Sequence, residues 1–144
     1  MEIMRPIAHA GEAGNQLLFL PGVFNETLAL LFDAHHYFQS RGVEEQAGLP
    51  AGERAIYASE MTRVTMRLTS VMAWIMVRRA IHAGRIEQEK AAVEYRLDGT
   101  EICLQHSSET IEQLPYYLGY LADRSRHLYE RVHRLDALAY GQMH

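Results

Sequence analysis

The sequence that decides the fold lies at residues 53–83 and reads ERAIYASEMTRVTMRLTSVMAWIMVRRAIHA. Neither glycine nor proline interrupts this stretch, and Gly84, a residue type that often ends helices, follows it directly. We therefore predict one continuous helix over residues 51–83. At a rise of 1.5 Å per residue, such a helix is roughly 45 Å long, well beyond the usual length in globular proteins.

This helix carries apolar side chains on more than one side. The main apolar stripe repeats every three to four residues and consists of Tyr57, Met61, Val64, Leu68, Val71, Met72, Ile75 and Met76. A second apolar group lies on the other side and consists of Met66, Ala73, Trp74, Val77 and Ile81. A helix that is apolar nearly all round is buried on several sides, so we expect it to need more neighbours than one partner helix.

Two further helices are expected on either side of this stretch, at residues 22–41 and 115–140. The apolar stripe of the first contains Phe24, Leu28, Leu31, His35 and Phe38. The stripe of the last contains Leu118, Leu121, Ser125, Leu128, Val132, Leu135 and Ala139. Residues 1–21 contain Pro6, Gly11 and Gly14 without a helical period, and we expect them to form a loose N-terminal arm. The pattern predicts an all-α protein, an elongated antiparallel three-helix bundle with two long helices, formed by a single domain at residues 22–141.

The stretch at residues 85–113 allows two interpretations. Residues 86–93 can form a short helix after the break at Gly84. Residues 93–97 and 100–104 flank Asp98-Gly99, a pair typical of the turn of a β-hairpin. The other interpretation is a long connecting loop, because an isolated two-stranded hairpin is marginally stable.

Composition excludes several classes of protein. The 144 residues have room for one domain, and 48% hydrophobic and 22% charged residues are ordinary globular values. A formal net charge of −4 argues against nucleic-acid binding, and the longest apolar runs are too short to span a membrane. The single cysteine, Cys103, cannot form an intramolecular disulfide and fits a reducing compartment. We expect a cytoplasmic protein.

Histidines at helical spacing raise the possibility of a metal site. Asp33-x-x-His36 and Glu130-x-x-His133 each place a carboxylate and an imidazole one helical turn apart, as in di-iron helical bundles. Such a site also needs glutamates from two other helices, and the sequence offers few candidates, so solvated surface residues are the simpler interpretation. No nucleophile motif and no phosphate-binding glycine loop is present. We expect no enzyme activity, no catalytic residue, no bound metal and no cofactor.

One face of the helix at residues 51–83 has the composition of a protein contact surface. Its members follow helical spacing, and Trp and Arg are enriched at interfaces. The candidate partner-binding or self-binding residues are Arg63, Arg67, Ser70, Trp74 and Arg78. The alternative is that Trp74 is packed within one chain, beneath residues 85–113 or beneath the N-terminal arm.

Several motifs resemble a known family. They are Ser59-Glu60-x-x-Arg63-x-Thr65-x-Arg67-Leu68, then Ala73-Trp74-Ile75-Met76, Arg79-Ala80, Gly84, Leu114-Pro115 and Ser125-x-x-Leu128-Tyr129-x-Arg131-Val132-x-Arg134-Leu135-Asp136. This pattern, over residues 22–140, resembles the alphaproteobacterial regulator of CtrA degradation family, formerly a domain of unknown function. The sequence departs from the pattern at Met61, where serine is usual, at Val64, where leucine is usual, and at Arg85, where an acidic residue is usual.

The resemblance implies a non-enzymatic adaptor of regulated proteolysis. Such a protein forms a homodimer and helps deliver a cell-cycle response regulator to a ClpXP-type protease. Family members extend past the last helix in a flexible tail that contacts partners, whereas this sequence stops at His144; an adaptor mechanism either differs here or resides in the bundle alone. Two alternatives remain open: a helical-bundle metal-binding enzyme using Asp33, His36, Glu130 and His133, and a purely structural dimeric interaction protein.

Overall fold

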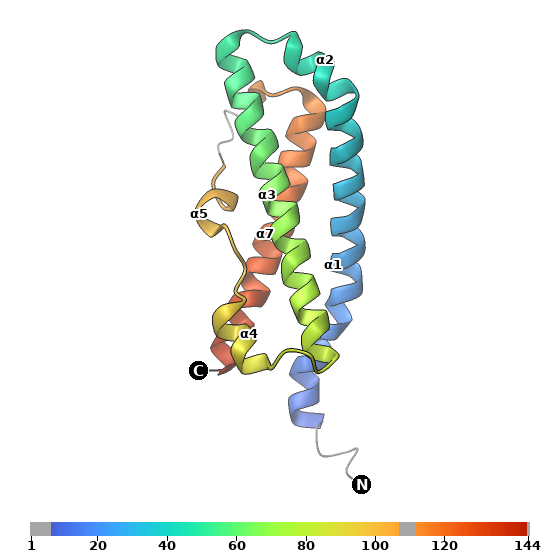
Figure 1. Cartoon of the computed structure of the whole chain (residues 1–144), viewed down its shortest axis with the longest axis vertical. Coiled ribbons are helices and arrows are strands. Elements are labelled where there is room, and N and C mark those ends of the chain that lie inside the picture. Colours follow the sequence, from blue (N-terminus) through green and yellow to red (C-terminus); the bar gives the residue numbers. More distant parts are fainter. Residues whose placement is uncertain (1–6, 107–111, 144) are drawn as a thin grey trace.

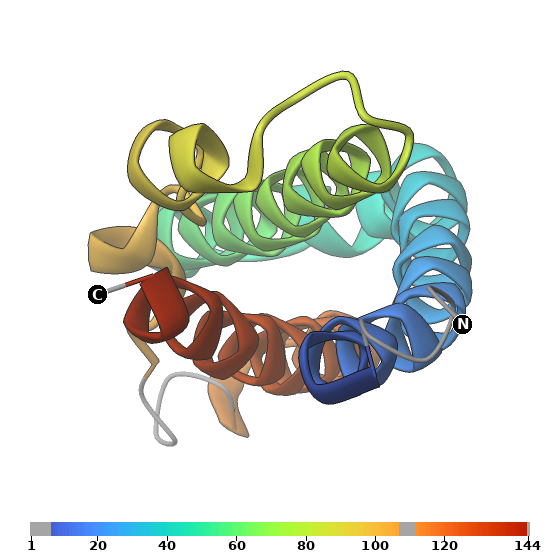
Figure 2. The ribbon, with the colours of Figure 1, turned by 90° about the horizontal axis from the view of Figure 1, so that it is seen from below.

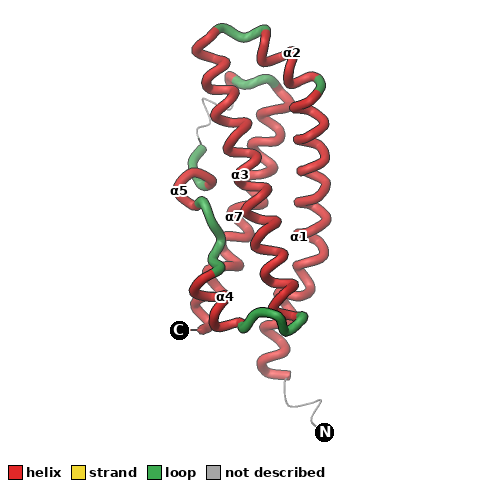
Figure 3. The backbone as a smooth tube through the Cα atoms, viewed as in Figure 1, coloured by secondary structure: helices red, strands yellow, loops and turns green. Residues whose placement is uncertain are grey.

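The protein is all-α over the part of the chain that its computed structural model describes, residues 7–106 and 112–143, with side chains described for residues 20–106 and 112–141. The helices are α1 (Ile7–Gln39), α2 (Arg41–Ala47), α3 (Ala51–His82), α4 (Gln88–Glu94), α5 (Thr100–Cys103) and α7 (Tyr116–Met143). Figures 1 and 3 show three long helices side by side and no strand among the described residues. The prediction of an all-α fold is confirmed.

Helix α3 occupies the centre of the bundle. Tyr57, Val64, Val71 and Ile75 are fully buried along it, as the main apolar stripe predicts. Seen along the bundle, α1 lies on one side of the α3–α7 pair, and α4 and α5 lie on the opposite side (Figure 2). Neighbours on both sides bury Trp74 of the second apolar group and partly bury Met66, Val77 and Ile81, whereas Ala73 is exposed. This partial cover explains why the helix lacks a fully polar face.

Helix α1 differs from the prediction. It begins at Ile7 and contains 33 residues, so residues 7–21 belong to a helix and not to a loose arm, and the bundle has three long helices where two were expected. Pro21 lies inside α1, although proline removes one backbone hydrogen bond and disfavours helix interiors. The buried line of α1 is Leu20, Val23, Thr27, Leu30, Ala34 and Tyr37, one residue before the expected stripe. His35 is exposed, because α1 contacts both α3 and α7 and turns the neighbouring line of residues into the core.

The direction of α7 also differs from the prediction. Arg67 contacts Ala122 while Trp74, later in α3, contacts Asp136, later in α7, so these two helices are parallel. Glu26 pairs with Arg131, whereas Tyr37, later in α1, packs on Tyr117, earlier in α7, so α1 is antiparallel to α7. A strictly antiparallel bundle was therefore a wrong expectation for the α3–α7 pair. The physical reason is the connection after α3, which runs back along the whole bundle before α7 begins (Figure 1).

This connection is helical where a hairpin was one of the two expectations. Helix α4 confirms the short helix expected near residues 86–93. The hairpin is wrong: Asp98 and Gly99 lie in a loop, and Gly99, at a φ of +77°, directly precedes helix α5. Cys103 N donates to Gly99 O at 2.8 Å, which closes that short helix. We call residues 95–106 the strap, since they cross the groove between α3 and α7.

A polar network closes the end of the bundle where α1, α2 and α3 meet. The Tyr37 hydroxyl donates to Glu45, and the Tyr57 hydroxyl donates to that of Tyr37 at 3.1 Å. Burial raises the pKa of both tyrosines. Gly42 is required in this corner, because a Cβ there would lie 2.8 Å from Tyr37 O and 2.9 Å from the Tyr57 hydroxyl oxygen. The network fixes the angle between α1 and α3 at this end of the bundle.

Candidate functional site

The five candidate residues of α3 share one helix face, as their spacing predicts, but most of this face is covered. Arg67, Trp74 and Arg78 are buried, with 1%, 3% and 3% of their surface exposed. Ser70 is half-buried, and the Arg63 side chain keeps 15% of its surface exposed. The strap and α7 cover this face, and whether its residues bind a partner or a second copy of the chain stays a prediction. The stated alternative, packing of Trp74 beneath residues 85–113, is what the structure has.

Arg67 is a buried cation that donates three hydrogen bonds to backbone carbonyls and one to a serine hydroxyl. Its Nε donates to Cys103 O at 2.7 Å and its Nη2 to Gln105 O at 2.8 Å, both on the strap. Its Nη1 donates to Ala122 O at 3.0 Å and to Ser125 Oγ at 3.3 Å, both on α7. Burial lowers the pKa of Arg67 to about 10, an effect that Glu60 partly opposes. One guanidinium thus joins α3, the strap and α7.

Asp136 on α7 is the buried carboxylate that joins the other end of the face. Its Oδ1 accepts the indole N–H of Trp74 at 3.0 Å, and its Oδ2 accepts Arg96 Nε of the strap at 2.8 Å. Arg78 Nη2 lies 3.8 Å from Oδ1, and the Arg78 guanidinium lies 4.8 Å from the centre of the Trp74 ring. Burial lowers the pKa of Arg78, and Asp136 opposes that shift. Nε and Nη2 of Arg78 have no hydrogen-bond partner, so its burial carries a desolvation cost.

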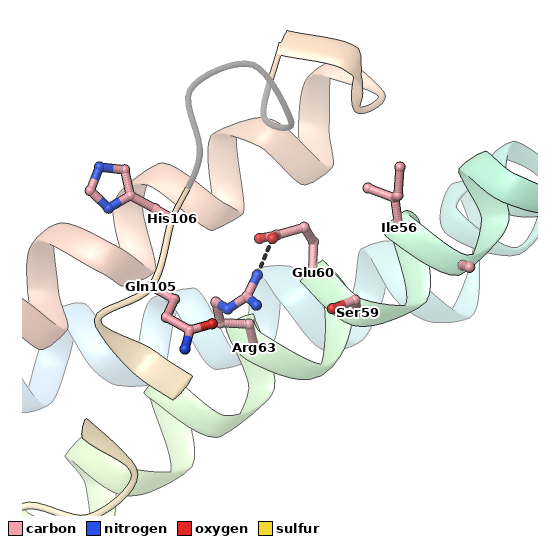
Figure 4. A pocket seen from close by; sticks show the side chains of 7 residues that line it. Ile56, Ser59, Glu60, Arg63, Gln105 and His106 are labelled. Atoms are coloured by element: carbon pink, nitrogen blue, oxygen red, sulfur yellow. Dashed lines mark hydrogen bonds and ion pairs between the residues drawn. The ribbon is translucent and has the colours of Figure 1, made fainter. Parts of the chain in front are cut away.

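Arg63 lines a hollow at the other end of the strap. It pairs with Glu60 one turn earlier, and its Nε donates to Ile102 O at 3.2 Å. Figure 4 shows the pair inside a hollow whose lining comes from α3 and from the strap; the lining residues are Ala55, Ile56, Ser59, Glu60, Arg63, Gln105 and His106. Glu60 is buried, which fits a carboxylate held by a neighbouring arginine.

Asp136 and the strap carbonyls are not among the site residues expected from sequence. Asp136 has a sequence signal: it follows Val132 by four residues, and a carboxylate on an apolar helix face needs a cationic partner. The carbonyls of Ile102, Cys103 and Gln105 have no signal in the sequence, because every residue carries a backbone carbonyl. The chemistry of the site is hydrogen-bond donation to a peptide backbone.

The residues considered for a metal site are not assembled into one. Asp33 and His36 are exposed on α1, and Glu130 pairs with Arg126 at 3.4 Å. His133 is half-buried on α7. Within residues 7–106 and 112–143, no group of three or more His, Cys, Asp or Glu side chains is arranged to hold a metal ion.

Comparisons with known proteins agree with the family resemblance. A family model described as a protein of unknown function, DUF1465, matches residues 16–144. The chain is similar to the crystal structure of RcdA from Caulobacter crescentus CB15, with 30% sequence identity, 84% of this chain and 90% of that chain covered, and a TM-score of 0.67. None of the curated proteins matches the chain. Among the described helices, none combines the length and the apolar character that crossing a membrane requires.

Proposed function

Since the chain belongs to the DUF1465 family and is related to RcdA, the regulator of CtrA degradation, we propose that it is a non-enzymatic adaptor of regulated proteolysis. In this role it delivers a cell-cycle response regulator to a ClpXP-type protease in the cytoplasm and acts as a homodimer. The observation that carries the proposal is the similarity to RcdA over most of both chains, at 30% identity and with a shared fold.

The physical role of an adaptor is to raise the local concentration of a cargo at the protease by binding both. This requires contact area on more than one face of the molecule. Exposed large apolar side chains are present on α1, α2, α3 and α7, namely Phe32, Val43, Met76, Tyr116 and Leu138. Scattered singly over separate elements, such side chains are ordinary on a protein surface, so the proposal rests on the similarity to RcdA and not on them.

The experiment that tests the proposal is an affinity purification from the native host, with this chain as bait and a proteolytically inactive ClpP as trap. Mass spectrometry identifies the recovered proteins, and an unrelated helical bundle of similar size serves as the control bait. Recovery of ClpX together with a response regulator is the expected result. Recovery of other partners without a protease component contradicts the proposal.

A reconstituted assay then measures the activity directly. The recovered regulator is incubated with purified ClpXP and increasing amounts of this chain, and its disappearance is followed over time. The rate of degradation is expected to rise with the concentration of the chain and to reach a plateau once the cargo is saturated. A rate that does not change with the chain contradicts an adaptor role. Sedimentation velocity tests the homodimer in the same preparation.

A further inference from the structure

The strap is incompletely packed along its edges. One hollow lies between the strap and the later part of α3, lined by Ser70, Ala73, Trp74, Val77 and residues 94–98. A second lies beside Ile102 and Gln105, lined on α3 by Ala58, Ser59, Thr62, Arg63 and Met66. With the hollow of Figure 4, the three follow α3 from residue 55 to residue 77, a length of roughly 33 Å. Segments with few packed neighbours open locally at lower free energy than the whole fold unfolds.

The strap is held through backbone carbonyls and through the Arg96 side chain, which donates to Asp136 Oδ2 at 2.8 Å. Arg63 and Arg67 bind the carbonyls of residues 102, 103 and 105, and the Tyr129 hydroxyl donates to Asp98 O at 2.6 Å. Its buried apolar side chains are Leu97 and Cys103. In an extended peptide, carbonyls two residues apart face the same side, as those of residues 103 and 105 do where they accept from Arg67. The carbonyl of Ile102, which accepts from Arg63, belongs to the short helix α5. Recognition of a carbonyl pair by Arg67 therefore does not depend on the strap's own side chains.

The donors have contacts on α7 that do not involve the strap. One side of the Arg67 guanidinium is fixed to α7 by Ala122 O and Ser125 Oγ, while Nε and Nη2 point to the strap. Trp74 is held on α7 by Asp136. Opening also returns the Arg67 cation toward water, and the lowering of its pKa indicates that burial disfavours this charge.

We propose that the strap is a displaceable cover and that the face beneath it, with Arg63, Arg67, Ser70 and Trp74, binds an extended peptide segment of a partner protein. The peptide takes the place of the strap and offers its backbone carbonyls to the same donors. At about 3.3 Å per residue, the row of hollows accommodates roughly ten extended residues. The identity of the partner rests on the proposed function; the opening of the strap and the binding of a peptide do not.

Opening can be measured at Cys103, a residue of the strap that is fully buried and is the chain's single cysteine. The rate at which a thiol reagent modifies it in the native protein is compared with the rate that global unfolding permits, across a series of urea concentrations. We expect modification at least about tenfold faster than global unfolding predicts, with little dependence on low urea. A rate that follows global unfolding at every urea concentration overturns the proposal.

Two glycines at positive φ give a matched pair of variants. Gly99→Ala strains the strap, since φ is +77° and the new Cβ would lie 3.2 Å from Cys103 Sγ. Gly84→Ala places the same strain at a φ of +74° outside the strap, where nothing lies within 4 Å of the new Cβ. Gly99→Ala is expected to speed the modification of Cys103 by a further factor of about ten, and Gly84→Ala is expected to leave it unchanged. Equal effects of the two variants contradict a local opening.

Peptide binding is tested with a labelled synthetic peptide that carries the strap sequence, residues 95–106, with serine in place of cysteine. Fluorescence anisotropy is expected to show about tenfold tighter binding to the Gly99→Ala variant than to the wild-type chain, because more of its face is uncovered. Adding Arg67→Met should abolish binding, whereas adding Arg54→Met, at an exposed position of α3, should not. Arg63→Met, at a partly exposed position, gives the same comparison if Arg67→Met does not fold. Binding that ignores both arginines, or no binding to Gly99→Ala, overturns the proposal.

Discussion

The hydrogen bonds of Arg67 predict that the shape of its guanidinium contributes more to the stability of the fold than its positive charge does. Arg67→Met removes four hydrogen bonds, two to the strap carbonyls and two to α7, and each bond from a charged donor contributes about 1.5–3 kcal/mol. Against this loss, the lowered pKa corresponds to roughly 3 kcal/mol of cost for keeping the charge buried, which methionine does not have. Arg67→Met is therefore expected to lower the free energy of unfolding by at least about 2 kcal/mol.

Arg67→Lys keeps the charge and loses the planar fork. The ammonium group of lysine cannot donate at once to Cys103 O, Gln105 O and Ala122 O, which lie on different sides of the planar guanidinium. The free-energy cost of burying a cation remains. We expect a loss of about 3 kcal/mol, at least as large as for methionine. The charge-conserving substitution is thus expected to give no rescue.

Urea denaturation measures these differences, followed by circular dichroism and by the fluorescence of Trp74, the single tryptophan. Arg54→Met is the control at an exposed position of α3 and should change the stability by less than about 0.5 kcal/mol. An Arg67→Lys variant within about 0.5 kcal/mol of the wild type would refute the reasoning, because it would mean that the charge alone suffices.

Three further predictions concern other parts of the fold. Gly42→Ala is expected to destabilise the protein by about 1–3 kcal/mol, because its Cβ would lie too close to the Tyr37 carbonyl and the Tyr57 hydroxyl. The control, Gly52→Ala, has free space around its Cβ and should be neutral or stabilising in the same urea titration. Asp136→Asn should lower the free energy of unfolding by about 3 kcal/mol and alter the fluorescence of Trp74, because it leaves Arg78 buried without a carboxylate. Unchanged stability and fluorescence would show that Asp136 does not hold this cluster together. The folded state raises the pKa of Tyr37, Tyr57, Tyr117 and Tyr129, so above pH 10 it retains protons that the unfolded chain releases. Stability should therefore fall as the pH rises past about 10, with Arg67 opposing weakly, and tyrosinate absorbance should show a late step that coincides with unfolding.

The sequence predicts the central helix well because its signal is local. An uninterrupted apolar pattern and a terminal glycine place a helix at residues 51–83, and α3 runs from Ala51 to His82. The last helix is also close to its expected bounds. The start of α1 was missed, since Pro21 and two glycines normally oppose a helix, and local propensity is a weak guide where a helix is long.

Neither the relative direction of two helices nor the burial of the charged face of α3 can be predicted from the local sequence. Hydrophobic periodicity says which side of a helix is buried, but it is the same for parallel and antiparallel neighbours. Arg67 looked like a surface residue because its type is charged, yet its acceptors lie 36 to 58 positions away along the chain. Three of those acceptors are backbone carbonyls, which cannot be predicted from residue types because every residue has one.

The parallel arrangement of α3 and α7 has a consequence for the order of folding during synthesis. Helices α1 and α3 are neighbours in sequence and can form a helical hairpin as soon as both have left the ribosome. The strap can bind Arg63 and Arg67 of α3 at that point, but its cover is incomplete, because Arg67 and Asp98 still lack the groups of Ala122, Ser125 and Tyr129 on α7. The nascent chain therefore presents an uncovered apolar side of α3 until its last helix is made, and a binding chaperone would recognise that intermediate rather than the finished protein.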